Sequence, residues 1–372
     1  MAYIYQLPDW PLYDYDLRAL TPALSNVLVQ QGRLFGRLEA LGFDDLQDAK
    51  LNAIAAEVVK SSEIEGERLD LEEVRSSVAR RLGMSVGGVP SGDHFVEGVV
   101  QMAMDASERC QLPLDEGRLF DWHGALFPSG RSEFGPIRVG QWRDDANGPM
   151  QVVSSAMSPR ETVHFEAPPA TLLAKEMRAF LDWFENGKEA SDILKAGIAH
   201  LWFVTIHPFS DGNGRIGRAI LDMALARADQ RRYRCYSVSA QIRKDRSAYY
   251  DALKSAQRGS LDYTGWLEWY LGCLDRALAS ALETVSGAMF RNRFWLVHKD
   301  KELNERQRKI VERMLMGFEG KMTKRKWAAM GKCAPMTAFR DIDDLVDKGI
   351  LVSDGCEGRS AGYLLAMDRS AL

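Results

Sequence analysis

Residues 196–206, the second part of a predicted helix at 191–206, form a strongly apolar stretch that leads straight into a loop rich in glycine and charged side chains. A helix that is apolar on most faces has to be buried, so this stretch predicts an internal helix. The loop covers residues 207–214, and helical periodicity resumes over residues 215–229. Any fold of this chain must therefore bury the first helix and, directly after it, present a base, a carboxylate and two cations.

Helical periodicity also covers most of the other residues. Leucines recur at close to helical spacing over residues 22–60, and Gly42 predicts a break between two helices. Gly66 ends the second of these, and Asp70 resembles the N-cap of the next. The further helices that we expect here span residues 93–110, 115–126, 245–258 and 261–291, and another begins after the two prolines at 168–169.

Residues 128–169 lack helical periodicity and are rich in proline and glycine. Two short segments of this region, 139–145 and 150–156, flank an Asn-Gly turn signal, so we predict that they pair as a β-hairpin. Val152 and Val153 favour a strand in the second segment.

The C-terminal part has a different pattern. Three helices are expected at residues 305–317, 324–330 and 335–348, followed by two short strands around a glycine-rich tip. This order is typical of a winged helix-turn-helix domain. We therefore predict a mainly α fold in three parts, namely an N-terminal helical segment (1–92), a helical core with a small hairpin (93–292) and a winged helix-turn-helix domain (301–372).

Composition restricts the class of protein. The chain has 372 residues, 46% of them hydrophobic and 27% charged, and its net charge of -4 argues against a general binder of polyanions. Its five cysteines are scattered without a Cys-x-x-Cys pair, as expected for reduced thiols rather than a disulfide frame or a zinc site. The sequence shows no secretory pattern and no apolar run of membrane length. These features predict a cytoplasmic protein without a membrane partner.

The loop before residues 215–229 has the features of an anion site. Gly212 and Gly214 allow the backbone to approach a ligand closely. A helix N-terminus directs free N–H groups and the positive end of the helix dipole at an anion. Arg215 and Arg218 lie three residues apart at the start of this helix, so their guanidinium groups can clamp a polyphosphate.

Two further side chains complete this candidate site. Asp211 suits an anionic ligand only if a divalent cation lies between them, and Mg²⁺ binds in this way through one or two carboxylates and phosphate oxygens. His207, at the end of the buried helix, is the expected proton acceptor. These residues predict phosphoryl chemistry on a nucleotide with Mg²⁺, but they leave open whether the bond at the α- or at the γ-phosphate breaks.

The segment HPFSDGNGRIGR, residues 207–218, resembles the signature of the Fic family, H-P-F-x-[D/E]-G-N-G-R-x-x-R, at every fixed position. The resemblance implies a Fic-type helical core that transfers AMP from ATP to a Ser, Thr or Tyr hydroxyl of a protein. It gives the role of base to His207 and that of Mg²⁺ ligand to Asp211. Arg215 would contact the β-phosphate and Arg218 the γ-phosphate. The residues expected to bind the phosphates of ATP are Gly212, Asn213, Gly214, Arg215, Ile216, Gly217 and Arg218.

Two other segments resemble parts of the same family. The region around Val152 and Val153 resembles the flap, a hairpin that clamps the backbone of the target protein by strand addition. An ordinary exposed hairpin is the alternative. Tyr249 and Gln257 fall where the family contacts adenine, although aromatic side chains on helices more often belong to a core.

An upstream segment resembles the inhibitory motif of the family, [ST]-x-x-x-E-[GN]. Ser61, Glu65 and Gly66 match it, and the first two lie four residues apart, so they share one helix face. The resemblance implies that Glu65 binds Arg218 and inhibits the enzyme. The alternative is a solvated acidic face, because residues 63–67 contain three glutamates.

The basic residues of the C-terminal part suggest a second function. Residues 321–340 carry six basic and no acidic side chains, and residues 301–372 carry 14 basic and 11 acidic ones. A basic stripe on a helix-turn-helix suits contacts with the phosphates of DNA. The acidic run at 341–347 argues against DNA, so protein contact or dimerisation is an equal alternative. The candidate DNA contacts are Lys324, Arg325, Thr337 and Arg340, with Phe339, Ile342, Leu345 and Val346 expected to face inward.

The function predicted from the sequence is Mg²⁺-dependent transfer of AMP from ATP to a hydroxyl group of a target protein or of the chain itself, autoinhibited by Glu65. Within this class of enzyme, removal of AMP or use of another nucleotide-linked donor are alternatives. From another class, the alternative is a DNA-binding regulator whose core senses ATP or ADP. An intact His207 argues against a sensor, which needs no base. The sequence does not identify the target, and it leaves the oligomeric state open, a homodimer included.

Overall fold

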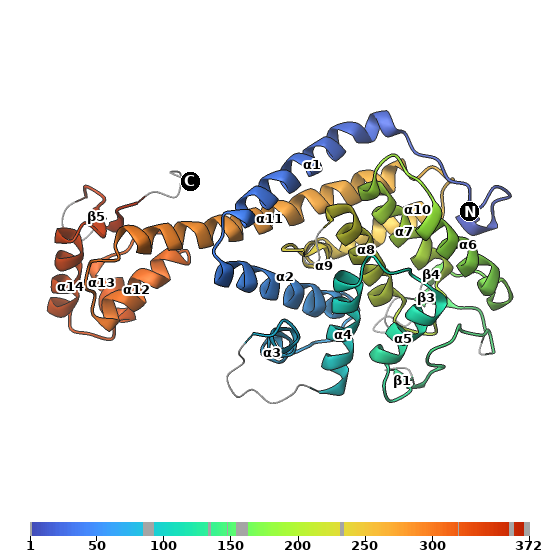
Figure 1. The fold of residues 1–372 in the computed structure, drawn as a ribbon, viewed down its shortest axis with the longest axis horizontal. Helices are drawn as coiled ribbons and strands as arrows, with labels where there is room; N and C mark the ends of the chain where they lie inside the picture. Colours follow the sequence, from blue (N-terminus) through green and yellow to red (C-terminus); the bar gives the residue numbers. More distant parts are fainter. Residues whose placement is uncertain are drawn as a thin grey trace. The chain divides into compact units, whose positions relative to one another are not determined.

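The structure is a computed structural model that describes residues 2–84, 93–132, 135–146, 148–153, 163–230, 234–318, 320–356 and 361–367. The chain divides into two compact units, the first with residues 1–35 and 42–281 and the second with residues 36–41 and 282–372 (Figure 1). Helices dominate both, as predicted. Among the described residues, no helix combines the length and the apolarity that a membrane crossing requires.

The first unit is helical apart from two small hairpins. Its helices are α1 (Leu17–Glu39), α2 (Phe43–Ile64), α3 (Leu71–Arg81), α4 (His94–Glu108), α5 (Glu116–Leu126), α6 (Leu173–Asn186), α7 (Asp192–Ile206), α8 (Asn213–Asp229), α9 (Val238–Lys244), α10 (Arg246–Gln257) and α11 (Thr264–Val297), with the 3-10 helices η1 (Ile4–Gln6) and η2 (Ala170–Leu172). The antiparallel strand pairs are β1 (Arg131–Ser132) with β2 (Gly135–Pro136), and β3 (Gln151–Val153) with β4 (Val163–Glu166). Helix α11 begins in this unit and ends in the second.

Helix α7 is the internal helix that the apolar stretch predicts. Every residue from Ala196 to Ile206 is buried, including the polar His200 and Thr205. Helix α8 packs along α7 (Figure 1). Left-handed backbone conformations at His207, with φ of 53°, and at Gly212, with φ of 82°, mark the two ends of the loop between them. The signature residues therefore join two buried helices.

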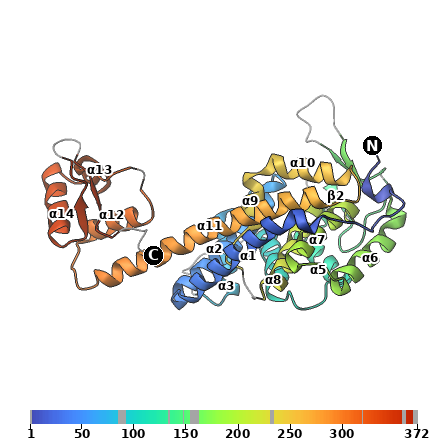
Figure 2. The same ribbon diagram turned by 90° about the horizontal axis from the view of Figure 1, so that it is seen from above.

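Two helices differ from the expectation. Helix α1 starts at Leu17 rather than at residue 22, because Asp16 Oδ1 accepts hydrogen bonds from the backbone N–H groups of its first turn. It lies along α11, where Asn26 Nδ2 donates to Asp275 Oδ1 at 2.8 Å (Figure 2). Helix α9 was not predicted, although Ser237 caps it with its side chain.

The hairpin prediction for residues 128–169 is wrong in its partner strand. Strand β3 contains Val152 and Val153, as expected, but it pairs with β4 and not with residues 139–145. The reason lies in Arg143, whose backbone N–H donates to the carbonyl oxygen of Pro208 at 2.9 Å. This bond ties the first predicted segment to the loop after α7, so it is not available for a ladder with β3.

The second unit has three helices followed by an antiparallel strand pair, in the predicted order. These elements are α12 (Glu305–Leu315), α13 (Lys324–Met330), α14 (Pro335–Asp347), β5 (Leu351–Ser353) and β6 (Tyr363–Leu365). A shared hydrophobic core holds them together, and it contains the fully buried Trp327 together with Ile310, Ile342 and Leu345.

The prediction that Phe339 faces inward is wrong. Ala338, Ile342 and Leu345 form the buried face of α14, and Phe339 lies one position outside it with 40% of its surface exposed. The Nζ atom of Lys324 lies 4.3 Å from the centroid of the Phe339 ring. Of the candidate DNA contacts, Lys324, Arg325 and Arg340 are exposed, as predicted, and Thr337 is partly exposed.

Two acidic residues of α14 are engaged within the second unit. The buried carboxylate of Asp341 accepts hydrogen bonds from Arg306 Nε at 2.6 Å and from Trp327 Nε1 at 3.1 Å. The carboxylate of Asp344 pairs with Lys348 Nζ at 2.6 Å. The acidic run at 341–347 is therefore partly neutralised by internal partners and is a weaker argument against an anionic partner than the sequence indicates.

Replacing Asp341 by Ala should lower the local free energy of unfolding of the second unit by about 2–3 kcal/mol, because Trp327 and Arg306 lose their acceptor. Burial alone would raise the pKa of Asp341, but the hydrogen bonds from its partners outweigh burial and hold the pKa below its usual range. The stabilisation is therefore present at neutral pH and is lost as the pH falls through that lowered pKa. Hydrogen exchange of peptides from α12 to α14 in the full chain measures the change. The exposed Asp343→Ala is the control, and equal protection in the two variants would contradict this account.

Candidate active site

The loop between α7 and α8 is braced by one side chain. Asn213 accepts a hydrogen bond from Phe209 N at 2.9 Å and donates one to Phe209 O at 2.7 Å. The Asn213 side chain, which we expected at the phosphates, is buried here and shapes the loop. Ile216 and Gly217 lie in the first turns of α8, where Ile216 is fully buried, so only their main-chain groups are available to a ligand.

The imidazole of His207 is in the state that a general base requires. Its Nδ1 atom lies 3.1 Å from the carbonyl oxygen of Val204. A carbonyl can only accept, so Nδ1 carries the proton and Nε2 keeps its lone pair. Burial and the positive charge of Arg143 lower the pKa of His207 to about 4, against opposing effects of the Val204 carbonyl and of Glu65. His207 is therefore neutral at pH 7.

The guanidinium group of Arg218 is held by the end of α2. Its Nη1 atom lies 2.7 Å from Glu65 Oε1, its Nε donates to Ser61 Oγ at 2.8 Å, and its Nη2 donates to the Ser61 carbonyl oxygen at 2.8 Å. The Arg218 side chain is 1% exposed, whereas that of Glu65 is 32% exposed. Burial alone would raise the pKa of Glu65, but Arg218 outweighs it and holds the pKa below its usual range. The two residues therefore form a charged pair with one edge open to solvent.

Arg215 has a carboxylate partner that sequence reasoning missed. Its Nη1 atom donates to both carboxylate oxygens of Glu67, at 2.9 and 2.7 Å, and Nη2 lies 3.8 Å from Asp211 Oδ1. Glu67 follows the turn at Gly66, where φ is 95°. The sequence presents Glu67 only as one of three clustered glutamates. One signal in the sequence could have indicated this pairing. The signature contains two arginines, and the segment expected to bind Arg218 contains more than one carboxylate, so a second carboxylate was available for Arg215.

The carboxylate of Glu65 lies close to the start of α8. A Cβ atom added to Gly214 would lie 2.0 Å from Glu65 Oε1, so the carboxylate lies directly against the backbone of the first helical turn. The positive end of the helix dipole stabilises an anion near the first turn of a helix. Glycine at 214 is thus required for an anion to approach the backbone this closely.

The side chain of Asp211 could bind a cation that is also bound by a nucleotide. Its side chain is partly exposed, and Oδ1 accepts a hydrogen bond from Gly212 N at 2.6 Å. No group of three or more His, Cys, Asp or Glu side chains with the arrangement of a metal site occurs in the part of the chain that the structure describes. A cation at Asp211 would take its other ligands from water and a nucleotide, and this donor set fits Mg²⁺.

Of the other predicted site residues, Tyr249 and Gln257 are buried and Val153 is exposed. Tyr249 is buried, with its hydroxyl 2.9 Å from His200 Nε2, and Gln257 is buried with Nε2 donating to Thr205 Oγ1 at 3.3 Å. The adenine contact of these two residues stays a prediction. Strand β3 presents Val153 to solvent, and its role as a target clamp also stays a prediction.

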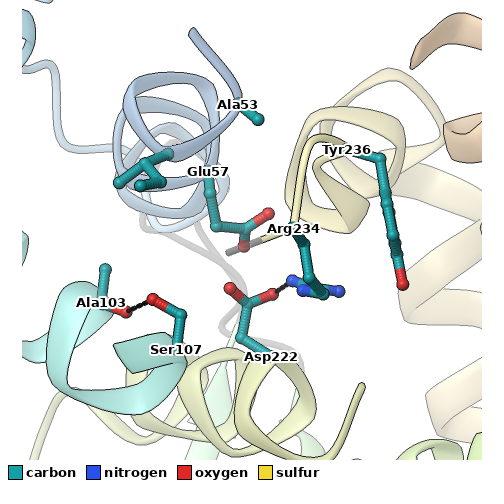
Figure 3. A pocket seen from close by; sticks show the side chains of 8 residues that line it. Ala53, Glu57, Ala103, Ser107, Asp222, Arg234 and Tyr236 are labelled. Carbon is teal, nitrogen blue, oxygen red and sulfur yellow. Dashed lines mark hydrogen bonds and ion pairs between the residues drawn. The ribbon is translucent and has the colours of Figure 1, made fainter. Parts of the chain in front are cut away.

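A buried polar cluster links α2 to the start of α9, and links α8 to Arg234 three residues before Ser237. Figure 3 shows Glu57 of α2, Asp222 of α8 and Arg234 around a small cavity. Arg234 pairs with Asp222, and Glu57 accepts hydrogen bonds from Ser237 Oγ at 2.7 Å and from the hydroxyl and backbone of Ser239. Because Glu57 lies one turn before Ser61, and Asp222 one turn after Arg218, the cluster fixes the register in which α2 offers Glu65 to Arg218.

These features define an anion site at a helix N-terminus, beside a neutral histidine and within a helical core. Residues 113–225, which include the whole loop, match the model of the Fic/DOC family, and residues 3–84 match that of a domain of unknown function, DUF4172. Residues 113–225 are therefore similar to the Fic/DOC family. The two matches fall within the predicted parts 1–92 and 93–292. The boundary between these two parts stays a prediction, because it lies inside the first compact unit.

Individual relatives agree with this family. The chain is 31% identical over 97 residues to a probable protein adenylyltransferase of Aquifex aeolicus, covering 26% of this chain and 28% of the relative. It is 28% identical over 238 residues to the protein adenylyltransferase Fic of Drosophila willistoni, covering 63% of this chain and 42% of the relative. The matched part thus spans less than half the length of either relative.

Two solved structures share the fold. A Fic family protein from Desulfovibrio desulfuricans has a TM-score of 0.51 at 23% identity, with coverage of 95% of this chain and 98% of that chain. A Fic domain containing signaling protein from Bacteroides thetaiotaomicron has a TM-score of 0.51 at 18% identity, with coverage of 70% and 97%. At these identities the likeness concerns the fold alone.

Proposed function

We propose that this site transfers AMP from ATP to a hydroxyl side chain of a target protein, or of the chain itself. One observation carries the proposal. The two arginines at the start of α8 are buried, and each binds a carboxylate close to His207. His207 is neutral, and its Nε2 atom carries no proton, so it can accept one. Buried guanidinium groups that bind two anions in this position fit the successive phosphates of a nucleotide.

The residues of the chain would perform the reaction as follows. The N-terminal turn of α8, Arg215 and Arg218 bind and orient the triphosphate, with Arg215 at the β- and Arg218 at the γ-phosphate, as in the family that the signature resembles. His207 Nε2 accepts the proton of the target hydroxyl while its oxygen bonds to the α-phosphorus. The bond from the α-phosphorus to the bridging oxygen breaks, and pyrophosphate leaves. Mg²⁺ bound at Asp211 would neutralise charge on the phosphates. Strand β3, through Val152 and Val153, would align the target backbone.

The same geometry supports autoinhibition. While Glu65 binds Arg218, this arginine cannot bind the γ-phosphate of ATP. The Glu65 carboxylate also lies against Gly214, where it would obstruct the approach of the phosphates to the start of α8. Glu67 adds a second restraint, because it occupies Arg215. ATP would therefore bind in a displaced position until this segment moves away.

The products of the reaction test the proposed function. Purified full-length chain with ATP, Mg²⁺ and a protein extract should release pyrophosphate, and AMP should become covalently attached to protein through its phosphate. Release of orthophosphate instead would mean cleavage at the γ-phosphate. Release of AMP from protein that already carries it would favour AMP removal, and absence of all of these activities would favour a nucleotide sensor.

A second function is proposed for the second unit, which we interpret as a winged helix-turn-helix domain that contacts DNA. The supporting observation is that Lys324, Arg325 and Arg340 are exposed while Asp341 and Asp344 are engaged internally. Contact with a protein, dimerisation included, is the alternative.

If the second unit binds DNA, its affinity should fall steeply with salt, with a logarithmic slope of about -0.9 for each phosphate neutralised. Replacing Lys324 and Arg325 together by Ala should reduce the slope by about two such steps. Fluorescence anisotropy with genomic fragments measures both values. A salt-independent or absent signal would leave the protein-contact alternative.

A further inference from the structure

Arg143 makes an unusual set of contacts for a residue outside the signature. Its side chain is almost fully buried, and its Nε atom donates to the carbonyl oxygen of His207 at 2.8 Å. Its own backbone N–H donates to the carbonyl oxygen of Pro208 at 2.9 Å. Arg143 thus binds two successive carbonyl groups of the loop that carries the base.

The other end of the same guanidinium group reaches the β3–β4 hairpin. Its Nη2 atom donates to the carbonyl oxygen of Pro168 at 2.6 Å, two residues after the end of β4. Its Nη1 atom donates to Asp145 Oδ1 at 2.8 Å, and Asp145 Oδ2 accepts from Ala170 N at 2.6 Å. One side chain therefore joins the loop of His207 to the exit of the strand pair.

The backbone at His207 needs such support. A non-glycine residue in the left-handed region is uncommon, and such conformations persist only where surrounding contacts fix them. Because His207 has φ of 53° and ψ of 57°, the direction of its side chain depends on these backbone angles. A small rotation at His207 or Pro208 would turn Nε2 away from the site.

We propose that Arg143 is a positioning residue for His207, which holds the backbone at residues 207–208 so that Nε2 faces the incoming hydroxyl, and which keeps this loop in register with the β3–β4 hairpin. The inference rests on the proposed function, because it assumes that His207 is the base. It adds a residue that lies 64 positions away from the histidine in the chain.

The charge of Arg143 provides a readout that a purely structural contact would lack. The groups that act on His207 are the Val204 carbonyl from α7, Glu65 from the end of α2, and Arg143. Arg143 lowers the pKa of His207, so removing its charge should raise that pKa. Since a protonated His207 cannot act as a base, the acidic limb of the rate profile should then move to higher pH.

The test compares Arg143→Met and Arg143→Lys in a Glu65→Gly background, where Glu65 no longer restrains transfer. Both variants lose the guanidinium group that binds the carbonyl oxygens of His207 and Pro168, so kcat should fall about 100-fold with little change in KM for ATP. NMR titration of His207 should show a raised pKa in Arg143→Met and a nearly unchanged one in Arg143→Lys. If Arg143→Met does not fold, the kcat of Arg143→Lys decides.

Arg227→Met is the matched control. Arg227 also donates to two carbonyl oxygens, those of Cys110 at 2.5 Å and Leu112 at 2.9 Å, and to one carboxylate, that of Glu185 at 2.9 Å. It should leave kcat within a few-fold of the parent and the pKa of His207 unchanged. Parental kcat in Arg143→Lys, or equal effects of Arg143→Met and Arg227→Met on kcat and on the pKa, would overturn the proposal. If the parent transfers no AMP, the proposed function fails, while the NMR titration still reports whether Arg143 acts on His207.

Discussion

Replacing Glu65 by Gly should raise the rate of AMP transfer about 10- to 100-fold at subsaturating ATP. The substitution frees Arg218, which then binds the γ-phosphate and brings the α-phosphate into line with the hydroxyl. A displacement of about 1 Å can change a rate 100-fold, so alignment alone accounts for an effect of this size. Initial rates with ATP labelled at the α-phosphate, over a range of ATP concentrations, measure it.

Glu63→Gly is the matched control for this substitution. Glu63 lies on the same segment, but its carboxylate pairs with Lys60 at 2.7 Å and Arg243 at 3.4 Å, away from the site. It should have little effect. Glu65→Gly combined with Arg218→Ala should be inactive again, because the clamp is lost. If Glu65→Gly is no faster than wild type at any ATP concentration, Glu65 does not inhibit.

Glu67 should limit the increase in the rate of AMP transfer that Glu65→Gly produces. Arg215 remains paired with Glu67 in Glu65→Gly, so the double variant Glu65→Gly/Glu67→Gly should be faster than either single variant. The two restraints differ in the nucleotide they affect. Because ADP has no γ-phosphate, Glu65→Gly should leave ADP affinity nearly unchanged, whereas Glu67→Gly should increase it by freeing the β-phosphate partner. Titration calorimetry with ADP separates the two.

Replacing His207 by Ala in the Glu65→Gly background should lower the transfer rate by about 10²–10⁴-fold, the usual effect of removing a general base. Affinity for ATP should remain close to that of the parent, since the phosphate contacts come from α8 and its arginines. The rate is measured with α-labelled ATP and the affinity by calorimetry. A variant that keeps the parental rate would refute the role of His207, and one that loses ATP binding would show that the histidine also holds the nucleotide.

The sequence predicts the parts of the site that depend on local chemistry. The apolar run of α7, the glycines at 212 and 214 and the arginines of α8 all lie within a few residues, and their geometry follows from the end of one helix and the start of the next. The helices and strands of the second unit were predictable for the same reason.

The missed features depend on contacts between distant segments. Glu67 and Arg215 lie 148 residues apart, and their pairing requires α2 to dock on α8 in the register that Glu57 and Asp222 impose. The strand partner of β3 was mispredicted because Arg143 binds the loop of His207 instead of continuing a hairpin. Such competition between partners is decided by packing, which local sequence patterns do not report.

Transfer of label from ATP to protein tests the central claim most directly. The variant Glu65→Gly is incubated with Mg²⁺ and ATP labelled at the α-phosphate or, separately, at the γ-phosphate, with Glu65→Gly/His207→Ala as the matched control. We predict that protein acquires label only from the α-phosphate, and only when His207 is present. Label from the γ-phosphate, or equal α-label in the control, would contradict AMP transfer by this site.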